Sequence, residues 1–117
     1  MRNYMLLVAF ALFACGASAR EKTISTALAT TDAARAAFVA FDATHQTAIV
    51  TKAPDDATGK AQLAAYRATQ AKIVLGFVTV YRAIAIAATA NNDQSLAGLL
   101  SVAGVLESEL RDLGVLK

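Results

Sequence analysis

Residues 73–90 read IVLGFVTVYRAIAIAATA, a stretch in which Arg82 is the only charged residue. Apolar residues return here every three or four positions, which is the spacing of one face of an α-helix. The same seam runs through residues 56–90 and comprises Leu63, Tyr66, Gln70, Ile73, Phe77, Val80, Ile84 and Ala87. Because residues 73–90 are apolar almost all round, we expect this helix to be buried on more than one side.

Two further helices are predicted beside it, at residues 23–51 and 93–113. Apolar residues recur at helical spacing in both. They are Ile24, Leu28, Phe38, Phe41, Ala48 and Ile49 in the first, and Leu96, Leu99, Ala103, Leu106, Leu110 and Leu113 in the second. Alanine, the best helix former, fills much of the remainder.

Turn signals separate the three segments. In KAPDDATGK, residues 52–60, Pro54 disfavours helix at the preceding residue, and Asp55 and Asp56 can cap the helix that follows. Asn91 with Gln94 three positions later predicts a capping box, and Gly114 predicts a helix end. Short connections between long helices make antiparallel neighbours. The sequence therefore predicts an all-α, up-down-up three-helix bundle over residues 20–117, with the middle helix at its centre.

The N-terminal residues 1–19 are typical of an export signal peptide. Arg2 supplies a positive charge, residues 4–14 are uncharged and apolar, and Ala17-Ser18-Ala19 is an A-x-A cleavage site. The apolar run is about half of the ~20 residues that a transmembrane helix needs. We expect residues 16–22 to form a short polar tether to the bundle.

Residues 12–15, LFAC, form a second candidate cleavage site. Leu12, Ala14 and Cys15 match a lipobox, whereas Phe13 occupies a position that usually holds a small residue. Cleavage before Cys15 would leave a lipid-modified N-terminal cysteine, and two or more acyl chains give stable membrane anchoring. Cleavage after Ala19 would instead release a soluble secreted protein, and a segment that is not cleaved would remain as an anchor. The sequence favours lipidation of Cys15, on the periplasmic side of the envelope.

This motif, followed by an alanine-rich helical body, resembles the small helical lipoproteins of bacteria and prophages. The resemblance covers the signal region, about the first fifth of the chain. It implies an address in the cell envelope, and Gly16, in place of the usual inner-membrane retention aspartate, favours the outer membrane in a Gram-negative host. Many such phage proteins belong to lysis or superinfection-exclusion cassettes. The single proline sets the chain apart from the proline-rich outer-membrane spanin type.

Composition argues against several functional classes. The chain has 11 Lys and Arg against 9 Asp and Glu, without a basic stripe, so nucleic acid is not an expected partner. Its single cysteine lies in the signal region, which leaves the mature chain without a disulfide. Its serines stand in no nucleophile motif, and no glycine-rich phosphate loop is present. We expect a protein that is not an enzyme and that binds no metal or cofactor.

Four polar residues are predicted to pair within the bundle. His45 lies on the seam of helix 23–51, level with Tyr66 of the next helix, so a hydrogen bond between them is expected. Arg82 interrupts an apolar stretch, where an unpaired buried charge is costly. Three alternatives are open for Arg82. It extends to water along its aliphatic stem, it pairs with Asp32, which lies opposite in an antiparallel hairpin, or it contacts a lipid headgroup phosphate or a partner.

Three functions remain open at this stage. The first is a membrane-tethered module that binds a protein partner or itself through Ile73, Phe77, Val80 and Ile84. The second is a holin-like membrane protein with residues 73–90 inserted, opposed by the ~2.5–3.5 kcal/mol cost of arginine at a helix centre. The third is a carrier of an apolar ligand, held between aromatic residues. Those residues are Phe38, Phe41, Tyr66, Phe77 and Tyr81. Small residues around Gly76, Gly98, Ser101 and Gly104 predict close helix packing or a self-association face.

Overall fold

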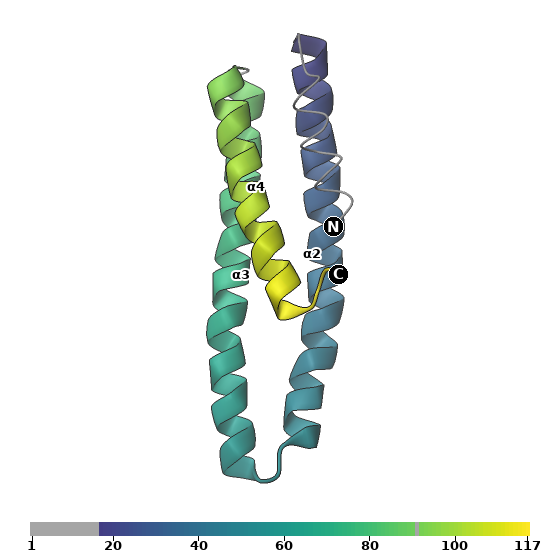
Figure 1. Cartoon of the computed structure of the whole chain (residues 1–117), viewed down its shortest axis with the longest axis vertical. Coiled ribbons are helices and arrows are strands. Elements are labelled where there is room, and N and C mark those ends of the chain that lie inside the picture. Colours follow the sequence, from purple (N-terminus) through teal and green to yellow (C-terminus); the bar gives the residue numbers. More distant parts are fainter. Residues whose placement is uncertain (1–16, 91) are drawn as a thin grey trace.

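The computed structural model describes residues 17–90 and 92–117, and this part of the chain is all-helical apart from its connections and C-terminal tail. The helices are α2 (Ala17–Lys52), α3 (Asp56–Ala90) and α4 (Asp93–Leu113). α2 and α3 form a long antiparallel hairpin, and α4 returns along the part of α3 nearest its C-terminal end (Figure 1). The predicted up-down-up three-helix bundle is confirmed, with α3 packed against both other helices.

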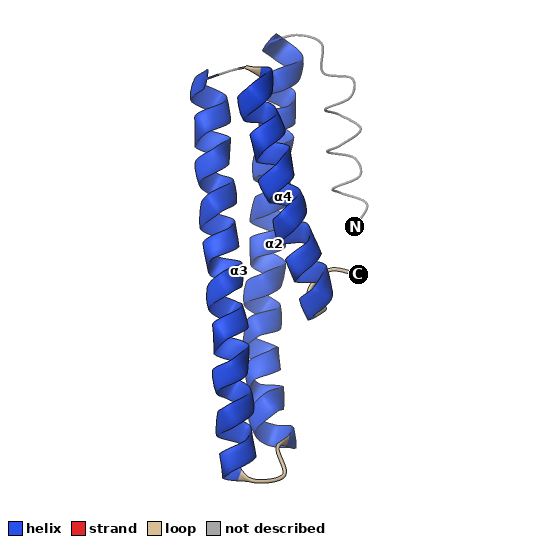
Figure 2. Cartoon of the chain, turned by 60° about the vertical axis from the view of Figure 1, so that its left-hand side comes forward, coloured by secondary structure: helices blue, strands red, loops and turns tan. Residues whose placement is uncertain are grey.

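The three helices differ in length, which divides the bundle into two parts. α2 and α3 have 36 and 35 residues, whereas α4 has 21. α4 ends at the level of Phe41, where Gly114 faces the aromatic ring. Beyond that level the molecule is a two-helix hairpin (Figure 2). Three helices therefore enclose a core at one end, and two helices pack along a narrower seam at the other.

The helix boundaries follow from local hydrogen bonds. Asp55 accepts a 2.7 Å bond from the Thr58 amide, which confirms it as the cap of α3. Asn92 caps α4 by accepting from the Ser95 amide at 2.8 Å. The capping box was predicted one residue earlier, at Asn91, which lies outside the described residues.

The end of α4 is a Schellman motif. Gly114 adopts a left-handed backbone with φ of 97°, as predicted for a terminating glycine. Its amide donates to the Arg111 carbonyl at 3.1 Å, and the Val115 amide donates to the Leu110 carbonyl at 2.9 Å. Val115 then packs against the core, so the tail is folded back onto the bundle.

The first helix begins earlier than predicted. α2 starts at Ala17 rather than at residue 23, so residues 17–22 are helical and do not form the expected tether. An ion pair of 2.9 Å joins Arg20 to Asp93 and holds the first turns of α2 against the start of α4. Residues 1–16, with the predicted lipidation site Cys15, lie outside the described part of the chain.

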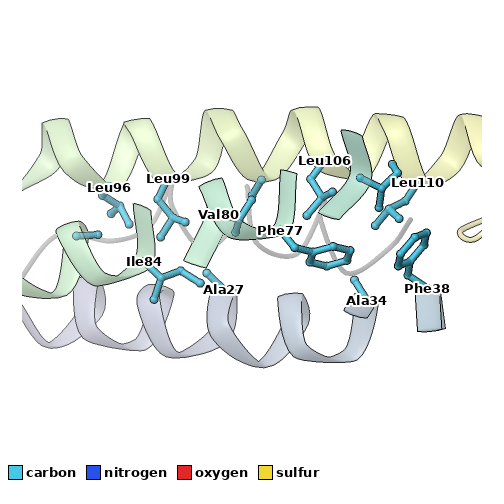
Figure 3. Packing of buried hydrophobic residues seen from close by; sticks show 13 residues of the cluster. Ala27, Ala34, Phe38, Phe77, Val80, Ile84, Leu96, Leu99, Leu106 and Leu110 are labelled. Atoms are coloured by element: carbon cyan, nitrogen blue, oxygen red, sulfur yellow. The ribbon is translucent and has the colours of Figure 1, made fainter. Parts of the chain in front are cut away.

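Buried side chains from all three helices meet along the bundle axis (Figure 3). The predicted seams of α3 and α4 supply most of this core: Ile73, Phe77, Val80, Ile84 and Ala87 from α3, and Leu96, Leu99, Ala103, Leu106 and Leu110 from α4. The predicted seam is therefore confirmed for these two helices.

α2 contributes a different face from the one predicted at its N-terminal half. Its buried residues there are small, namely Thr23, Ala27, Thr31 and Ala34, whereas Leu28 is 41% exposed. Phe38, farther along α2, is buried as predicted. The Thr31 hydroxyl donates to the Ala27 carbonyl at 2.6 Å, which satisfies its hydrogen bond inside the core. Small side chains at this face let α2 approach the large side chains of α3 and α4.

The expectation that α3 is buried on more than one side is wrong for much of residues 73–90. Val74, Leu75, Val78 and Ile86 are between 44% and 65% exposed. The reason is geometric: α2 and α4 both pack on the seam side of α3, and no third helix of the described chain covers the opposite side. By length and composition α3 could cross a membrane, and 28% of its most apolar 18-residue window is buried.

Candidate functional site

A polar cluster occupies the seam between α2 and α3, at the level where α4 ends. Its centre is the Asp42 carboxylate, which accepts hydrogen bonds from three side chains. The Tyr66 hydroxyl donates at 2.7 Å, Gln70 Nε2 at 2.8 and 2.9 Å, and Gln46 Nε2 at 3.1 Å to each oxygen. Residues 42 and 46 lie one turn apart on α2, as do 66 and 70 on α3, so the four side chains meet across the hairpin.

The cluster holds Asp42 in its charged form. Partial burial alone raises the pKa of this carboxyl, but hydrogen bonds from Tyr66, Gln46 and Gln70, with nearby His45, outweigh that effect and hold the pKa below its usual 3.8. Burial also raises the pKa of Tyr66 well above its usual 10, and the bond to Asp42 adds to this. A carboxylate with a lowered pKa and three committed donors is a poor general base near neutral pH.

His45 and Tyr66 meet, as predicted, but not through the expected hydrogen bond. Their rings are 4.7 Å apart between centroids at an angle of 53°, and His45 stacks on Phe41 at 4.9 Å. The Tyr66 hydroxyl donates to Asp42 instead. The carboxylate is the stronger acceptor, and it lies within reach on the same helix as His45.

Asp32 and Arg82 are not brought together as an ion pair. The Tyr81 hydroxyl donates to Asp32, and the Arg35 guanidinium lies 6.0 Å from the centre of the Tyr81 ring. Burial raises the pKa of Tyr81, and the bond to Asp32 adds to it. Arg82 is exposed, which corresponds to the predicted extension into water. Position 81, rather than 82, faces the hairpin partner.

The residues predicted as an interaction face are core residues. Ile73, Phe77, Val80 and Ile84 have at most 7% of their surface exposed, so a partner cannot reach them while the bundle is closed. The apolar surface of α3 that is accessible lies on the other side of the helix. Sequence periodicity predicted the seam correctly. It does not predict that the apolar residues between the seam positions are exposed to solvent.

A shallow groove runs between α3 and α4 on the outside of the bundle. We call it the α3–α4 groove. It has a volume of about 290 Å³, and its lining is mainly apolar: Lys72, Leu75, Gly76, Thr79, Val102, Val105, Leu106 and Glu109. Leu75 and Val105 are 65% and 59% exposed. Lys72 and Glu109 pair at 3.1 Å, so the groove carries one charge of each sign.

The glycines of α3 and α4 separate into two kinds. A Cβ at Gly76 would lie 3.0 Å from Leu106 Cδ1, so this glycine permits the close packing predicted between α3 and α4. A Cβ at Gly98 or Gly104 would meet nothing within 4 Å. The prediction that Gly98 serves close packing within the bundle is therefore wrong, because it lies on the solvent side of α4.

The aromatic residues considered as a ligand cavity have other contacts. Phe38 and Phe77 pack with ring centroids 6.0 Å apart in the core, and the hydroxyls of Tyr66 and Tyr81 bond to Asp42 and Asp32. Across residues 17–90 and 92–117, no three His, Cys, Asp or Glu side chains are grouped so as to hold a metal ion. No family model, curated protein or solved structure matches the chain.

Proposed function

We propose that this protein is an exported, non-enzymatic helical module that is held at the cell envelope by a lipid on Cys15 and associates through the outside of its bundle. The observation that carries the proposal is the exposed apolar surface of α3, where Leu75 is 65% exposed beside Val105 of α4. Exposed apolar side chains gathered on one surface mark interaction sites more often than isolated ones do.

The lipobox supports the proposed location in the cell envelope. Leu12, Ala14 and Cys15 stand directly after the apolar run of a signal peptide, where a lipid-attachment cysteine is required. α2 begins at Ala17, two residues after Cys15, so a chain cleaved before the cysteine would hold its bundle close to the membrane. Tyr66, Gln70 and Gln46 all donate hydrogen bonds to the Asp42 carboxylate, which supports a structural role for these polar residues.

The α3–α4 groove favours a second copy of the chain over an unrelated protein. Lys72 and Glu109 lie side by side at the groove. If two grooves face each other about a twofold axis, Lys72 of each copy can pair with Glu109 of the other. Gly98 of α4 is exposed and nothing lies within 4 Å of its Cβ position, so a second helix could approach closely there. Together these features describe a self-complementary surface.

Sedimentation velocity of the purified mature chain tests this association. We expect the wild type to dimerise as concentration rises and Leu75→Glu to stay monomeric, because it places a charge in the apolar groove. Val39→Glu is the matched control, because Val39 lies on α2, outside the groove, and is 61% exposed. This variant should dimerise like the wild type. A wild type that stays monomeric throughout would contradict the self-association proposal.

A second candidate function is a holin-like membrane protein in which residues 73–90 of α3 are inserted. Its support is that α3 is long and apolar enough to span a bilayer. Insertion would place Arg82 near the middle of the membrane at a cost of about 2.5–3.5 kcal/mol and would separate Ile73 and Phe77 from the core. Carbonate extraction of Cys15→Ser distinguishes the candidates: an inserted helix stays in the membrane fraction, whereas a lipid-dependent protein leaves it.

A further inference from the structure

The side of α3 that points away from the core carries an unusual combination of side chains. We call it the outer face, and six exposed residues define it: Lys60, Arg67, Val74, Val78, Arg82 and Ile86. They recur at intervals of seven and four residues, so they form one stripe along the helix. The stripe combines apolar and cationic side chains, and no acidic residue occurs between positions 57 and 90.

The positive charge of the outer face is not neutralised within the described chain. Lys60, Arg67 and Arg82 form no ion pair there. On the neighbouring helices, Asp32 accepts from the Tyr81 hydroxyl and Glu109 pairs with Lys72. Asp56, four residues before Lys60 on α3, forms no ion pair with it. Four basic residues and one acidic residue leave α3 with a charge of +3, whereas residues 93–117, with two basic and four acidic residues, carry −2. The charge of the bundle is therefore segregated to its α3 side.

From this pattern we infer that the outer face of α3 rests on the surface of an anionic phospholipid bilayer. Helices that lie in a membrane interface combine apolar side chains with lysine and arginine, and anionic headgroups attract such segments. Residues 60 and 82 are about 33 Å apart along the helix, so the cations suit an extended charged surface rather than one small anion. Val74, Val78 and Ile86 lie beside Arg82 and would enter the headgroup region.

The charge pattern also argues against a second copy on this face. Two outer faces brought together would place six arginines and lysines in one interface, with Asp56 at the start of each α3 as the acidic residue that helix offers, and like charges oppose association. The inference rests on the proposed function for placing the chain in the envelope. A chain anchored at Cys15, next to the start of α2, would have its bundle beside the bilayer. The α3–α4 groove adjoins this face at Leu75, which lies three residues before Val78 and seven before Arg82.

The test uses the chain purified from membranes, with Val78→Cys carrying an environment-sensitive fluorophore. Intact mass first establishes the N-terminus. With Cys15 lipidated or removed with the signal, the introduced cysteine is the only free thiol. The chain is placed in vesicles of phosphatidylcholine with or without phosphatidylglycerol. Ala36→Cys on the exposed side of α2 is the matched control.

We expect a blue shift and quenching by spin-labelled lipid for the probe at 78 in the anionic vesicles, and neither effect for the probe at 36. Both effects should weaken with added salt. Arg82→Gln should lower the ratio of bilayer-facing to water-facing probe about fivefold, since each cation near an anionic surface contributes roughly that factor.

Three outcomes would overturn the inference. The first is a probe at 78 that stays in water although the lipidated chain remains on the vesicles. The second is an equal shift in vesicles without phosphatidylglycerol, and the third is a shift without vesicles that grows with protein concentration, which would assign the face to a second copy. A chain that starts at Arg20 without lipid would contradict only the proposal that Cys15 tethers the protein. The binding of that chain to added vesicles would still test whether the outer face contacts an anionic bilayer.

Discussion

The Tyr66 hydroxyl of α3 donates a 2.7 Å hydrogen bond to the Asp42 carboxylate of α2, where the three-helix part of the bundle gives way to the two-helix hairpin. Tyr66 is 6% exposed and Gln70 is partly buried, so both depend on Asp42 for a polar partner. A two-helix seam buries less apolar surface than a three-helix core. The bond therefore aligns α2 and α3 at the point where α4 no longer holds them.

Replacing Asp42 should destabilise the bundle. Asp42→Ala leaves the Tyr66 hydroxyl and the Gln70 amide without their acceptor, and a buried donor without a partner costs about 1–3 kcal/mol. Thermal unfolding should show a melting temperature several degrees lower. Asp112→Ala is the control, because Asp112 is exposed, and it should unfold like the wild type. Equal melting temperatures for Asp42→Ala and the wild type would show that the cluster adds no stability.

The stabilising effect of Asp42 should disappear in acid. Its pKa is lowered in the folded state, so the folded chain binds fewer protons than the unfolded chain, and stability falls as pH decreases. The contribution of Asp42 is fully present above the usual pKa of 3.8 and is lost as pH falls through the lower pKa of the folded state. Urea midpoints of the wild type and Asp42→Asn should differ at pH 7 and converge below about pH 4. A difference that is independent of pH would contradict this assignment.

Two glycines in different surroundings should respond differently to alanine. Gly98→Ala should stabilise the fold by about 0.5–1 kcal/mol, because alanine is the better helix former and nothing lies within 4 Å of its Cβ. Gly76→Ala places a Cβ 3.0 Å from the buried Leu106 side chain, so overpacking should cancel or reverse that gain. Chemical denaturation should therefore show Gly98→Ala to be more stable than Gly76→Ala by at least about 0.5 kcal/mol. The reverse order would mean that α3 and α4 are farther apart.

Two apolar residues of α4 should differ in their effect on stability. Leu99 is 0% exposed, and Leu99→Ala should cost about 2–5 kcal/mol through lost burial and a cavity. Val105 is 59% exposed, and Val105→Ala should change the unfolding free energy of the monomer by less than about 0.5 kcal/mol. Both are measured by urea unfolding at a protein concentration too low for association. Similar losses at both positions would contradict the orientation of α4.

Helix number, the connections and the seams of α3 and α4 could be predicted because they depend on local chemistry. Pro54, Asp55 and Gly114 end or begin helices through their own backbone constraints and hydrogen bonds. Leu99 and Ile73 follow the period of an α-helix. Such signals act within a few residues, so a sequence pattern contains them.

The Asp42 cluster and the buried face of α2 could not be predicted in the same way. Thr23 and Thr31 are polar, and they are compatible with a core because their hydroxyls bond to carbonyls of their own helix. Which acceptor Tyr66 reaches depends on the register of two helices, and a shift of one residue exchanges Asp42 for another side chain. The sequence does contain one signal for the Asp42 cluster: Asp42 and Gln46 are four residues apart, and so are Tyr66 and Gln70, so each pair lies on one side of its helix.

The tether at Cys15 is the central claim, and the intact mass of the mature chain tests it most directly. Wild type and Cys15→Ser are compared in membrane and soluble fractions. The proposal predicts a chain that begins at Cys15, carries the added mass of acyl chains in the membrane fraction, and loses that mass in the variant. A soluble chain that begins at Arg20 in both proteins would contradict it and would leave a secreted helical bundle.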